Sequence, residues 1–392
     1  MKSPIAHDDL KIIRTIAAIE PLREFWTSQP THRDADLAFY LFFLGATPEV
    51  IRPHVIALYR DRLPYALLVG RLEERRLDIK IGYFRLWTRK LRTLTFVYQG
   101  LLGDQSELSS ESFVHSILEV LRDGEADVAM LHSLDVNMPL FRLAISLPKR
   151  RFSDRVTTPK VHRMTDLCSV KGTFLNSLSQ KARYQQRRKA KALVEEFQGN
   201  VRIECFTRQD QVGRLMQDAE VVACKSYQRG LGVGFSDTEF MRQRLTMEAG
   251  KGWLRGYVLY LGDQPCSFWI TSLCGNVLHS NVQGFDPRYA KYSPGMYLVI
   301  KVIEDIYDHP DAAGQPTEVD FGLGEAEFKE RLSNRSWWES SVYIFAPTLL
   351  GFSVNSLRTL VALSEKPMRA ILEKSRLLSK VKRVWRARMR RE

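Results

Sequence analysis

Hydrophobic positions in the first third of the chain fall in short runs that are separated by charged turns such as "RDRLP" and "EERR". This pattern is typical of an antiparallel meander. It predicts strands at residues 54–59, 65–69, 77–86 and 94–101. The pattern then changes to a helical period in "SSESFVHSILEVLRDG", which ends at a glycine. A buried strand, "ADVAMLHSL", and a second helix, "MPLFRLAISL", precede the basic connector "PKRRFSDRVTTPK".

The same order of elements returns after this connector. It predicts a long basic helix over residues 172–197, a strand "VRIECF", a helix over 209–227 and another from Ser236, where Glu239 completes the sequence pattern of a capping box. Strands at 254–260, 265–272 and 277–285 follow, then a helix at 295–307 and the strand "TEVDF". The halves share element order and no sequence identity. We therefore expect an α/β protein with two mixed sheets flanked by helices.

The length of 392 residues allows two or three domains. We expect an N-terminal lobe at 1–160, a C-terminal lobe at 161–350 and a basic helical tail at 351–392. The tail carries much of the net charge of +13, because residues 366–392 hold eleven Lys or Arg against two Glu. Its segment 374–392 has apolar residues at helical spacing among the bases, which suits either contact with an anionic membrane surface or phosphate contacts with RNA.

The five cysteines show no metal-ligand spacing with the eight histidines, so we expect a reduced cytoplasmic protein without a bound metal. The apolar runs Leu37–Ala46 and Val342–Val354 are shorter than the roughly 20 residues of a membrane span. The start of the chain does not resemble a signal peptide. These features predict a cytoplasmic protein whose tail lies at the inner face of the membrane.

A candidate anion site lies in "VQGFDPRYAKYSPGMYLVIKVIEDIY", where a strand ends near Phe285 and a helix begins after a loop. The loop contains Lys291, Tyr292 and Ser293, and the helix opens with Pro294-Gly295. Free backbone N–H groups at a helix start bind anions, and a glycine lets a phosphate approach closely. The alternative is an ordinary capped helix, since Ser followed by Pro is good capping.

Candidate catalytic groups lie in "EVDFGLGEAEFKERL", at the carboxyl end of a strand, where α/β sheets collect ligands. We expect Asp320, Glu325 and Lys329 to face one cleft. A lysine there stabilises an oxyanion, and a carboxylate takes a proton from the attacking amine or hydroxyl. The alternative is a solvated lysine that pairs with Glu325 across one helical turn.

Three further features are candidates for substrate binding. Arg183, with its basic neighbours, suits a CoA phosphate or an anionic sugar chain, and equally a solvated helix face. His279 on the third meander strand is either a base or a structural residue. The stretch "GLGVGF" at 230–235 follows a helix rather than a strand, so it indicates a loop over the cleft and not a dinucleotide site.

Together with "FLNSLSQKARYQQRRKAKAL", these segments resemble the acetyltransferases associated with cellulose and other exopolysaccharide biosynthesis, which are related to the Fem-type aminoacyltransferases. The resemblance implies a duplicated GNAT-like fold whose working site lies in the second copy. It matches Pro294-Gly295 to the family's helix start and Phe328-Lys329 to its aromatic-lysine pair, which implies that Lys329 acts in the transition state. Glu325 departs from the usual Asp, and Phe328 from the commoner Tyr.

The expected function is direct transfer from acetyl-CoA or another acyl-CoA to an amine or hydroxyl of a sugar, glycan or amino-acid-type precursor, in polysaccharide or envelope biosynthesis. Catalysis is assigned to Lys329, Asp320 and Glu325. CoA binding is assigned to residues Lys291, Tyr292, Ser293, Gly295 and Phe285, and acceptor binding to Arg183, His279 and Phe328. Two alternatives stay open: a Fem-like transferase that uses aminoacyl-tRNA, the one case with a nucleic-acid partner, and an inactive GNAT-fold partner of a glycan-synthesis complex.

Overall fold

The computed structural model describes residues 9–77, 79–81, 84–85, 89–226, 234–309 and 316–374. The chain forms two compact units. Unit 1 contains residues 1–160 and 338–392, and unit 2 contains residues 161–337. Residues 338–350, which we expected in the C-terminal lobe, therefore lie in unit 1. The tail beyond Lys374 and most of the predicted loop at 230–235 lie outside the described residues.

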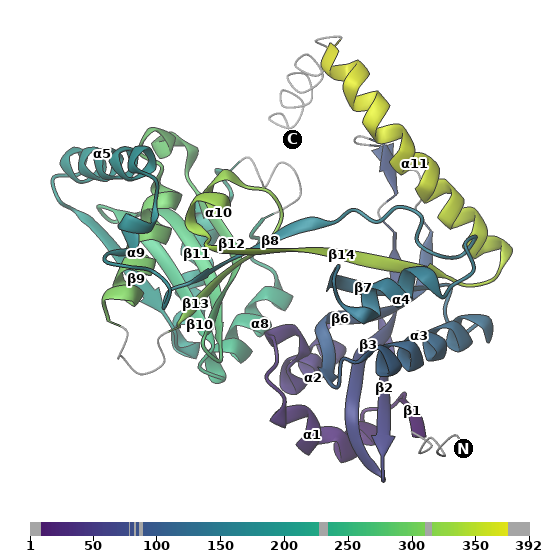
Figure 1. The fold of residues 1–392 in the computed structure, drawn as a ribbon. Helices are drawn as coiled ribbons and strands as arrows, with labels where there is room; N and C mark the ends of the chain where they lie inside the picture. The colour runs from purple at the N-terminus through teal and green to yellow at the C-terminus, as the bar shows by residue number, and fades with distance from the viewer. Residues whose placement is uncertain are drawn as a thin grey trace. The chain divides into compact units, whose positions relative to one another are not determined.

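Unit 1 is built on a mixed sheet. Its strands, in spatial order, are β1 (Asp9–Ile13), β2 (Val50–Arg60), β3 (Leu63–Arg76), β6 (Lys90–Gly103), β7 (Val128–Asp135) and β14 (Arg335–Phe345). Only β6 and β7 run parallel among the ladders described for this sheet. Helices α1 (Arg23–Ser28) and α2 (Leu37–Ala46) pack on one face, and α3 (Glu107–Arg122) and α4 (Pro139–Ser146) on the other (Figure 1).

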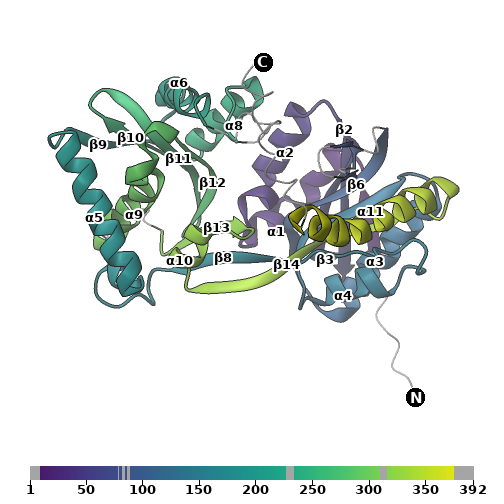
Figure 2. The ribbon, with the colours of Figure 1, turned by 90° about the horizontal axis from the view of Figure 1, so that it is seen from above.

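Unit 2 repeats this arrangement. Its strands, in spatial order, are β8 (Lys160–Asp166), β13 (Glu318–Leu323), β12 (Val277–Phe285), β11 (Gln264–Cys274), β10 (Leu254–Leu261) and β9 (Val201–Phe206). Here β12 and β13 are the parallel pair. Figure 2 shows α6 (Val212–Ala223) and α8 (Glu239–Gly250) on one face and α5 (Gln180–Glu196) and α9 (Pro294–Asp308) on the other. Each unit thus has strands of mixed direction with helices on both faces, which confirms the expected α/β fold class.

Several local predictions were wrong. Where one strand was expected at 77–86, the described residues hold two short strands, β4 (Lys80–Ile81) and β5 (Phe84–Arg85), which pair with each other, and β3 continues to Arg76. The basic helix begins only at α5, after a short 3-10 turn at Phe174–Ser177, and Ser179 caps it by accepting from the N–H of Ala182. Helix α8 is capped by Thr238 and not by Ser236.

Strands β8 and β14 were not predicted from the sequence. The apolar run Val342–Val354 divides between the end of β14 and the start of α11 (Leu349–Lys374). Within the described part of the chain, no helix combines the length and the apolar character that a membrane span requires.

Helix α9 is anchored firmly to the sheet of unit 2. Its apolar residues recur every three or four positions, and Leu298, Ile303 and Ile306 are buried against a cluster that includes Trp269 of β11. Burial of each such side chain stabilises the fold by about 1.5–3 kcal/mol. The N-terminus of α9 is therefore held at a fixed place above the end of β12.

Candidate functional site

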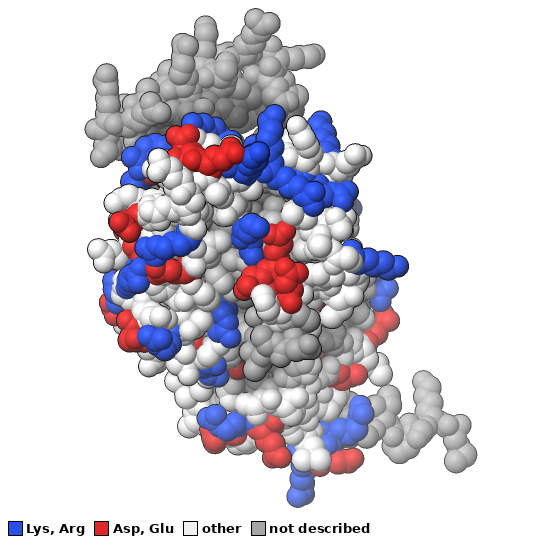
Figure 3. Space-filling model, turned by 90° about the vertical axis from the view of Figure 1, so that its left-hand side faces the viewer, with Lys and Arg blue, Asp and Glu red and all other residues white. Residues whose placement is uncertain are grey.

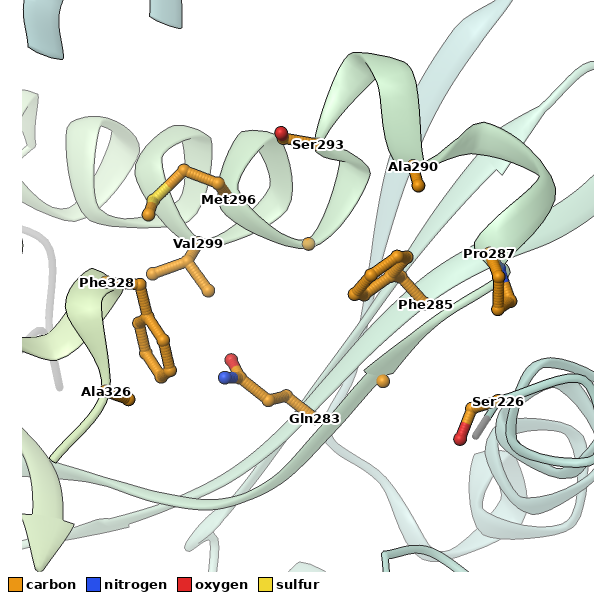
Figure 4. Close-up of a pocket in the computed structure, with 12 residues that line it drawn as sticks. Ser226, Gln283, Phe285, Pro287, Ala290, Ser293, Met296, Val299, Ala326 and Phe328 are labelled. Atoms are coloured by element: carbon orange, nitrogen blue, oxygen red, sulfur yellow. The ribbon is translucent and has the colours of Figure 1, made fainter. Parts of the chain in front are cut away.

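A cavity of about 440 Å³ lies in unit 2, between the end of β12, the N-terminus of α9 and the short helix α10 (Glu327–Leu332) (Figure 4). Its walls are mostly apolar and come from chain segments that are far apart in sequence. The lining residues are Ser226, Gln283, Gly284, Phe285, Pro287, Ala290, Ser293, Gly295, Met296, Val299, Ala326 and Phe328.

The cavity exists because β12 and β13 separate. The two strands pair only from Val277 to His279 on β12 and from Glu318 to Asp320 on β13. Beyond this point β12 continues to Phe285 along β11, whereas β13 continues to Leu323 along β8. The gap leaves an edge of β12 without the β13 ladder, and the start of α10 lies across it.

A β-bulge decides which side chains of β12 face this cavity. Val282 pairs with Ile270 and Ser280 with Thr271, so Asn281 is an extra residue in the strand. After the bulge, Gln283 and Phe285 lie on the α9 face and point into the cavity (Figure 4). Before the bulge, His279 lies opposite Ser272, whose hydroxyl donates to Glu248 of α8. His279 therefore lies on the other face of the sheet.

The N-terminus of α9 is open toward the cavity. Ser293 adopts a left-handed conformation (φ 54°, ψ 58°), and its side chain does not cap the helix. Its Oγ instead accepts a hydrogen bond from Nζ of Lys189 on α5, at 2.7 Å. The next residues, Gly295 and Met296, line the cavity. First-turn N–H groups without a side-chain cap, together with the helix dipole, form an anion-binding position.

A side chain at position 295 would not clash with the rest of the protein. A Cβ atom added there would meet Cδ1 of Phe285 at 3.5 Å, an ordinary van der Waals distance. At Gly284, on the opposite face of β12, a Cβ would lie only 2.6 Å from the ring of Phe268. Packing therefore accounts for the glycine at 284, whereas at 295 the absent side chain leaves room on the cavity side.

The predicted cofactor residues divide into two groups. Phe285, Ser293 and Gly295 line the cavity. Tyr292 instead is buried in a cluster with Leu193 of α5. Nζ of Lys291 lies 4.6 Å from the centre of the Tyr292 ring, and the hydrogen bond to that tyrosine raises the pKa of the lysine. The structure thus directs both side chains away from the cavity, because the 3-10 turn at Pro287–Tyr292 points them toward α5.

Asp320 is buried and holds two imidazoles. Its Oδ1 accepts from Nε2 of His162 at 2.6 Å and from the N–H of Gly322 at 2.6 Å, and its Oδ2 accepts from Nδ1 of His279 at 3.1 Å. Burial alone would raise the pKa of this carboxyl, but the hydrogen bonds and charges of His162 and His279 outweigh burial and lower the pKa well below its usual range. The group is a carboxylate at neutral pH.

His162 was not found by sequence reasoning. It lies on β8, a short strand with mixed polar residues, and its hydrogen-bond partner is 158 positions away in sequence. Trp337 stacks on its ring, with centroids 4.3 Å apart and an interplanar angle of 11°. Only the pairing of β8 with β13 brings His162 to the carboxylate, and no local pattern signals that pairing.

The other predicted catalytic residues lie nearby on α10 and the turn before it. Nζ of Lys329 donates to the carbonyl of Leu323 at 2.8 Å, at the end of β13. Burial lowers the pKa of this lysine, and the charge of Asp320 partly offsets that effect. Glu325 is exposed, with its carboxylate 3.6 Å from the Arg163 guanidinium. Lys329 and Glu325 therefore do not form the ion pair that was the alternative.

The predicted acceptor-binding residues lie apart from one another. Phe328 lines the cavity. Arg183 donates to Asn176 at 2.8 Å and is at the first turn of α5. Exposed bases continue along this helix at Lys181, Arg187, Arg188 and Lys191. Figure 3 shows several Lys and Arg side chains, with acidic ones among them, near the top of the described surface on the side that it faces. Arg187 and Lys301 also border a smaller cavity of about 170 Å³ between α5 and α9.

Comparisons with known proteins agree with this fold. Residues 180–330 match the family model described as an acetyltransferase (GNAT) domain. The chain is similar to a crystal structure of FemX, with 11% identity, a TM-score of 0.54, and coverage of 86% of this chain and 97% of that one. No curated protein matches the sequence at a significant level.

Two other solved structures are similar over the same range. One is the C-terminal domain (DUF2156) of a putative lysylphosphatidylglycerol synthetase from Agrobacterium fabrum, at 12% identity, covering 88% of this chain and 96% of that one, with a TM-score of 0.50. The other is a tandem GNAT protein from the clavulanic acid biosynthesis pathway, at 11% identity, covering 87% and 99%, with a TM-score of 0.50. At these identities the likeness shows the fold, a duplicated GNAT-like architecture.

Proposed function

We propose that this protein is an acyltransferase that takes its acyl group from acyl-CoA, because residues 180–330 match the model of a GNAT-type acetyltransferase domain. It transfers that group directly to an amine or hydroxyl of a sugar, glycan or amino-acid-type precursor. The observation that carries this proposal is the apolar cavity that meets the open N-terminus of α9.

The cavity fits the two chemically different parts of an acyl-CoA. A volume of about 440 Å³ lies within the usual range of small-molecule sites. The apolar side chains Phe285, Val299 and Phe328 suit the pantetheine arm. The amide groups at Gly295 and Met296 suit the pyrophosphate, and Lys189 adds a positive charge at the same helix start.

The separated strand edge suits the amides of pantetheine. Beyond His279, β12 has no ladder with β13 in the described structure, so its backbone groups on that side face the gap. An extended ligand with its own amides binds such an edge in the way an added strand does. In this pose the thioester lies near the point where β12 and β13 separate, next to Lys329 and Asp320.

Direct attack on the thioester completes the proposal. The acceptor nitrogen or oxygen attacks the carbonyl carbon, and the ammonium of Lys329 stabilises the negative charge that develops on the carbonyl oxygen. The Lys329 ammonium is bonded to the Leu323 carbonyl in this structure, so its side chain has to turn toward the gap during catalysis. Glu325 is exposed beside Arg163, and we assign it to the rim.

The test is to incubate the purified full chain with acetyl-CoA and longer acyl-CoAs. We expect acetyl-CoA to raise the melting temperature, because a ligand that binds only the native state stabilises it, and free thiol to appear when an acceptor amine or hydroxyl is added. Absence of both effects would contradict the proposal. Stimulation by aminoacyl-tRNA instead, with activity falling steeply with salt, would favour the Fem-like alternative.

The basic tail supports a second, independent part of the proposal. From its composition, we infer that residues 374–392 bind an anionic membrane surface and so bring the enzyme close to membrane-linked precursors. Sedimentation with vesicles that contain anionic lipid tests this. Binding that is lost when residues 375–392 are removed is expected, and equal binding to neutral vesicles would contradict it.

A further inference from the structure

We propose that His279 is the general base of the acyl transfer, and that Asp320 and His162 are positioning residues that hold its imidazole in place. This inference rests on the proposed acyltransferase activity and assigns the proton that the acceptor must lose. From the sequence alone, Asp320 or Glu325 is expected to take this proton; here Asp320 instead orients the base.

His279 lies where the β12–β13 ladder ends. It forms the last pair of the β12–β13 ladder, opposite Asp320, and the strands separate directly after it. The bulge at Asn281 leaves His279 on the α8 face, while the cavity lies on the α9 face. A thioester that enters the gap from the α9 side would come close to His279, which is buried on the α8 face, and the acceptor would have to reach it from that face.

The carboxylate of Asp320 selects one tautomer of the His279 imidazole. An ionised carboxylate only accepts hydrogen bonds, so Nδ1 of His279 carries the proton that it donates to Oδ2 of Asp320. The basic lone pair of the neutral ring is then on Nε2. A carboxylate that orients an imidazole and stabilises its protonated form is a well-established device for taking a proton from a nucleophile.

Asp320 is itself held rigidly by two hydrogen-bond donors. His162 and the Gly322 N–H both donate to its Oδ1, and Trp337 stacks on the His162 ring. Within the described residues of unit 2, the charged groups near the pair include Lys329 on α10 and, through Ser272 and Asn281, the buried Glu248 of α8 with its ion-pair partner Arg244. Such a network fixes the orientation of the His279 ring.

In the proposed step, proton transfer to His279 accompanies the attack on the thioester. The acceptor O–H or N–H gives its proton to Nε2 of His279 while its lone pair forms the bond to the thioester carbonyl carbon. The tetrahedral intermediate then collapses, the C–S bond breaks, and the CoA thiolate takes the proton back from the imidazolium. The products are the acylated acceptor and CoA with a free thiol, and no further reactant is needed.

Two substitutions separate catalysis from structure. His279→Asn keeps an N–H near the position of Nδ1, able to donate to Asp320, but removes Nε2. His162→Gln in the same way keeps a donor near the position of Nε2. For His279→Asn we expect thiol release to fall by a factor of about 100 or more, in keeping with the loss of a general base. Its melting temperature and its stabilisation by acetyl-CoA should match those of the wild type.

The pH profile and rescue complete the test. The wild-type rate should fall on the acid side, because a general base accepts a proton only in its unprotonated form; His279→Asn should lack this limb, and added imidazole should restore part of the rate to His279→Gly. His162→Gln should lower the rate less and shift the acid limb. A His279→Asn enzyme with more than a third of the wild-type rate and an unchanged profile would overturn the proposal. So would a wild type that binds acetyl-CoA but never releases thiol, whereas failure to bind acetyl-CoA would refute the proposed function itself.

Discussion

His279 and Asp320 face each other across the last pair of the β12–β13 ladder, with Nδ1 of the histidine 3.1 Å from Oδ2 of the aspartate. On one side of this pair the strands stay joined, and on the other they separate and the cavity begins. The pair therefore lies where a donor on the α9 face and an acceptor on the α8 face would meet.

Gly295→Ala should weaken acyl-CoA binding without harming the fold. A methyl group fits at this position of the protein, but it narrows the approach of a phosphate to the helix start. We expect the melting temperature to stay equal or rise slightly and the stabilisation by acetyl-CoA to shrink. Gly213→Ala is the matched control, since Gly213 is also the second residue of its helix and has open space around it. An equal response of both variants to acetyl-CoA would contradict the assignment.

Lys329→Met should lower turnover and leave acetyl-CoA binding intact. Loss of an oxyanion donor costs about 10²–10³ in rate, whereas loss of the single hydrogen bond to Leu323 costs only about 1 kcal/mol of stability. Steady-state kinetics and thermal unfolding measure the two effects separately. Lys329→Arg should retain part of the rate because it keeps the charge. A normal turnover rate of the Lys329→Met enzyme would mean that the lysine only connects α10 to the end of β13.

Asp320→Asn should change the acid stability of the protein. The folded-state pKa of Asp320 is lowered, so the carboxylate stabilises the fold fully above the unfolded pKa of about 4, and this stability is lost as the pH falls further. Urea unfolding at pH 7 should show a loss of about 1–3 kcal/mol in the variant. The difference from the wild type should narrow below about pH 4. A constant difference across this range would mean that the charge of Asp320 contributes nothing.

Lys189→Met should reduce the affinity for acetyl-CoA and make it less sensitive to salt. Its ammonium lies at the start of α9, where it contacts Oγ of Ser293. Lys191→Met is the control, because Lys191 is exposed and pairs with Glu195 along the same helix. Titrations at low and high salt should separate the two. An equal loss of affinity in both variants would indicate only the overall positive charge of α5, which salt screens.

The fold of unit 2 could be predicted well wherever the hydrophobic period was clear. The strand expected at 277–285 matches β12, and the helix expected at 295–307 lies within α9. The helix is amphipathic, so its pattern reports directly on one face of a packed element, whereas the residues of β12 do not alternate in burial. The same reasoning failed for β8 and β14, whose mixed sequences acquire strand structure from their partners β13 and β7.

The candidate site was predictable only in part for a related reason. Ser293 and Gly295 carry local signals, a capping residue and a glycine at a helix start. His162 has none, because its role depends on the neighbouring strand β13. The direction of His279 depends on the bulge at Asn281, which shifts the alternation of β12 by one residue. Lys291 and Tyr292 lie outside the cavity lining because the 3-10 turn before α9, which the sequence pattern did not signal, directs them toward α5.

Titration calorimetry of the full chain with acetyl-CoA tests the central claim most directly. Ala326 lines the cavity, and Ala326→Trp fills it, whereas Ala17→Trp places the same ring on an exposed position of unit 1. The account predicts one site per chain in the wild type and in Ala17→Trp, and loss of binding in Ala326→Trp with no loss of thermal stability. Undiminished binding by Ala326→Trp, or no binding by the wild type, would contradict it.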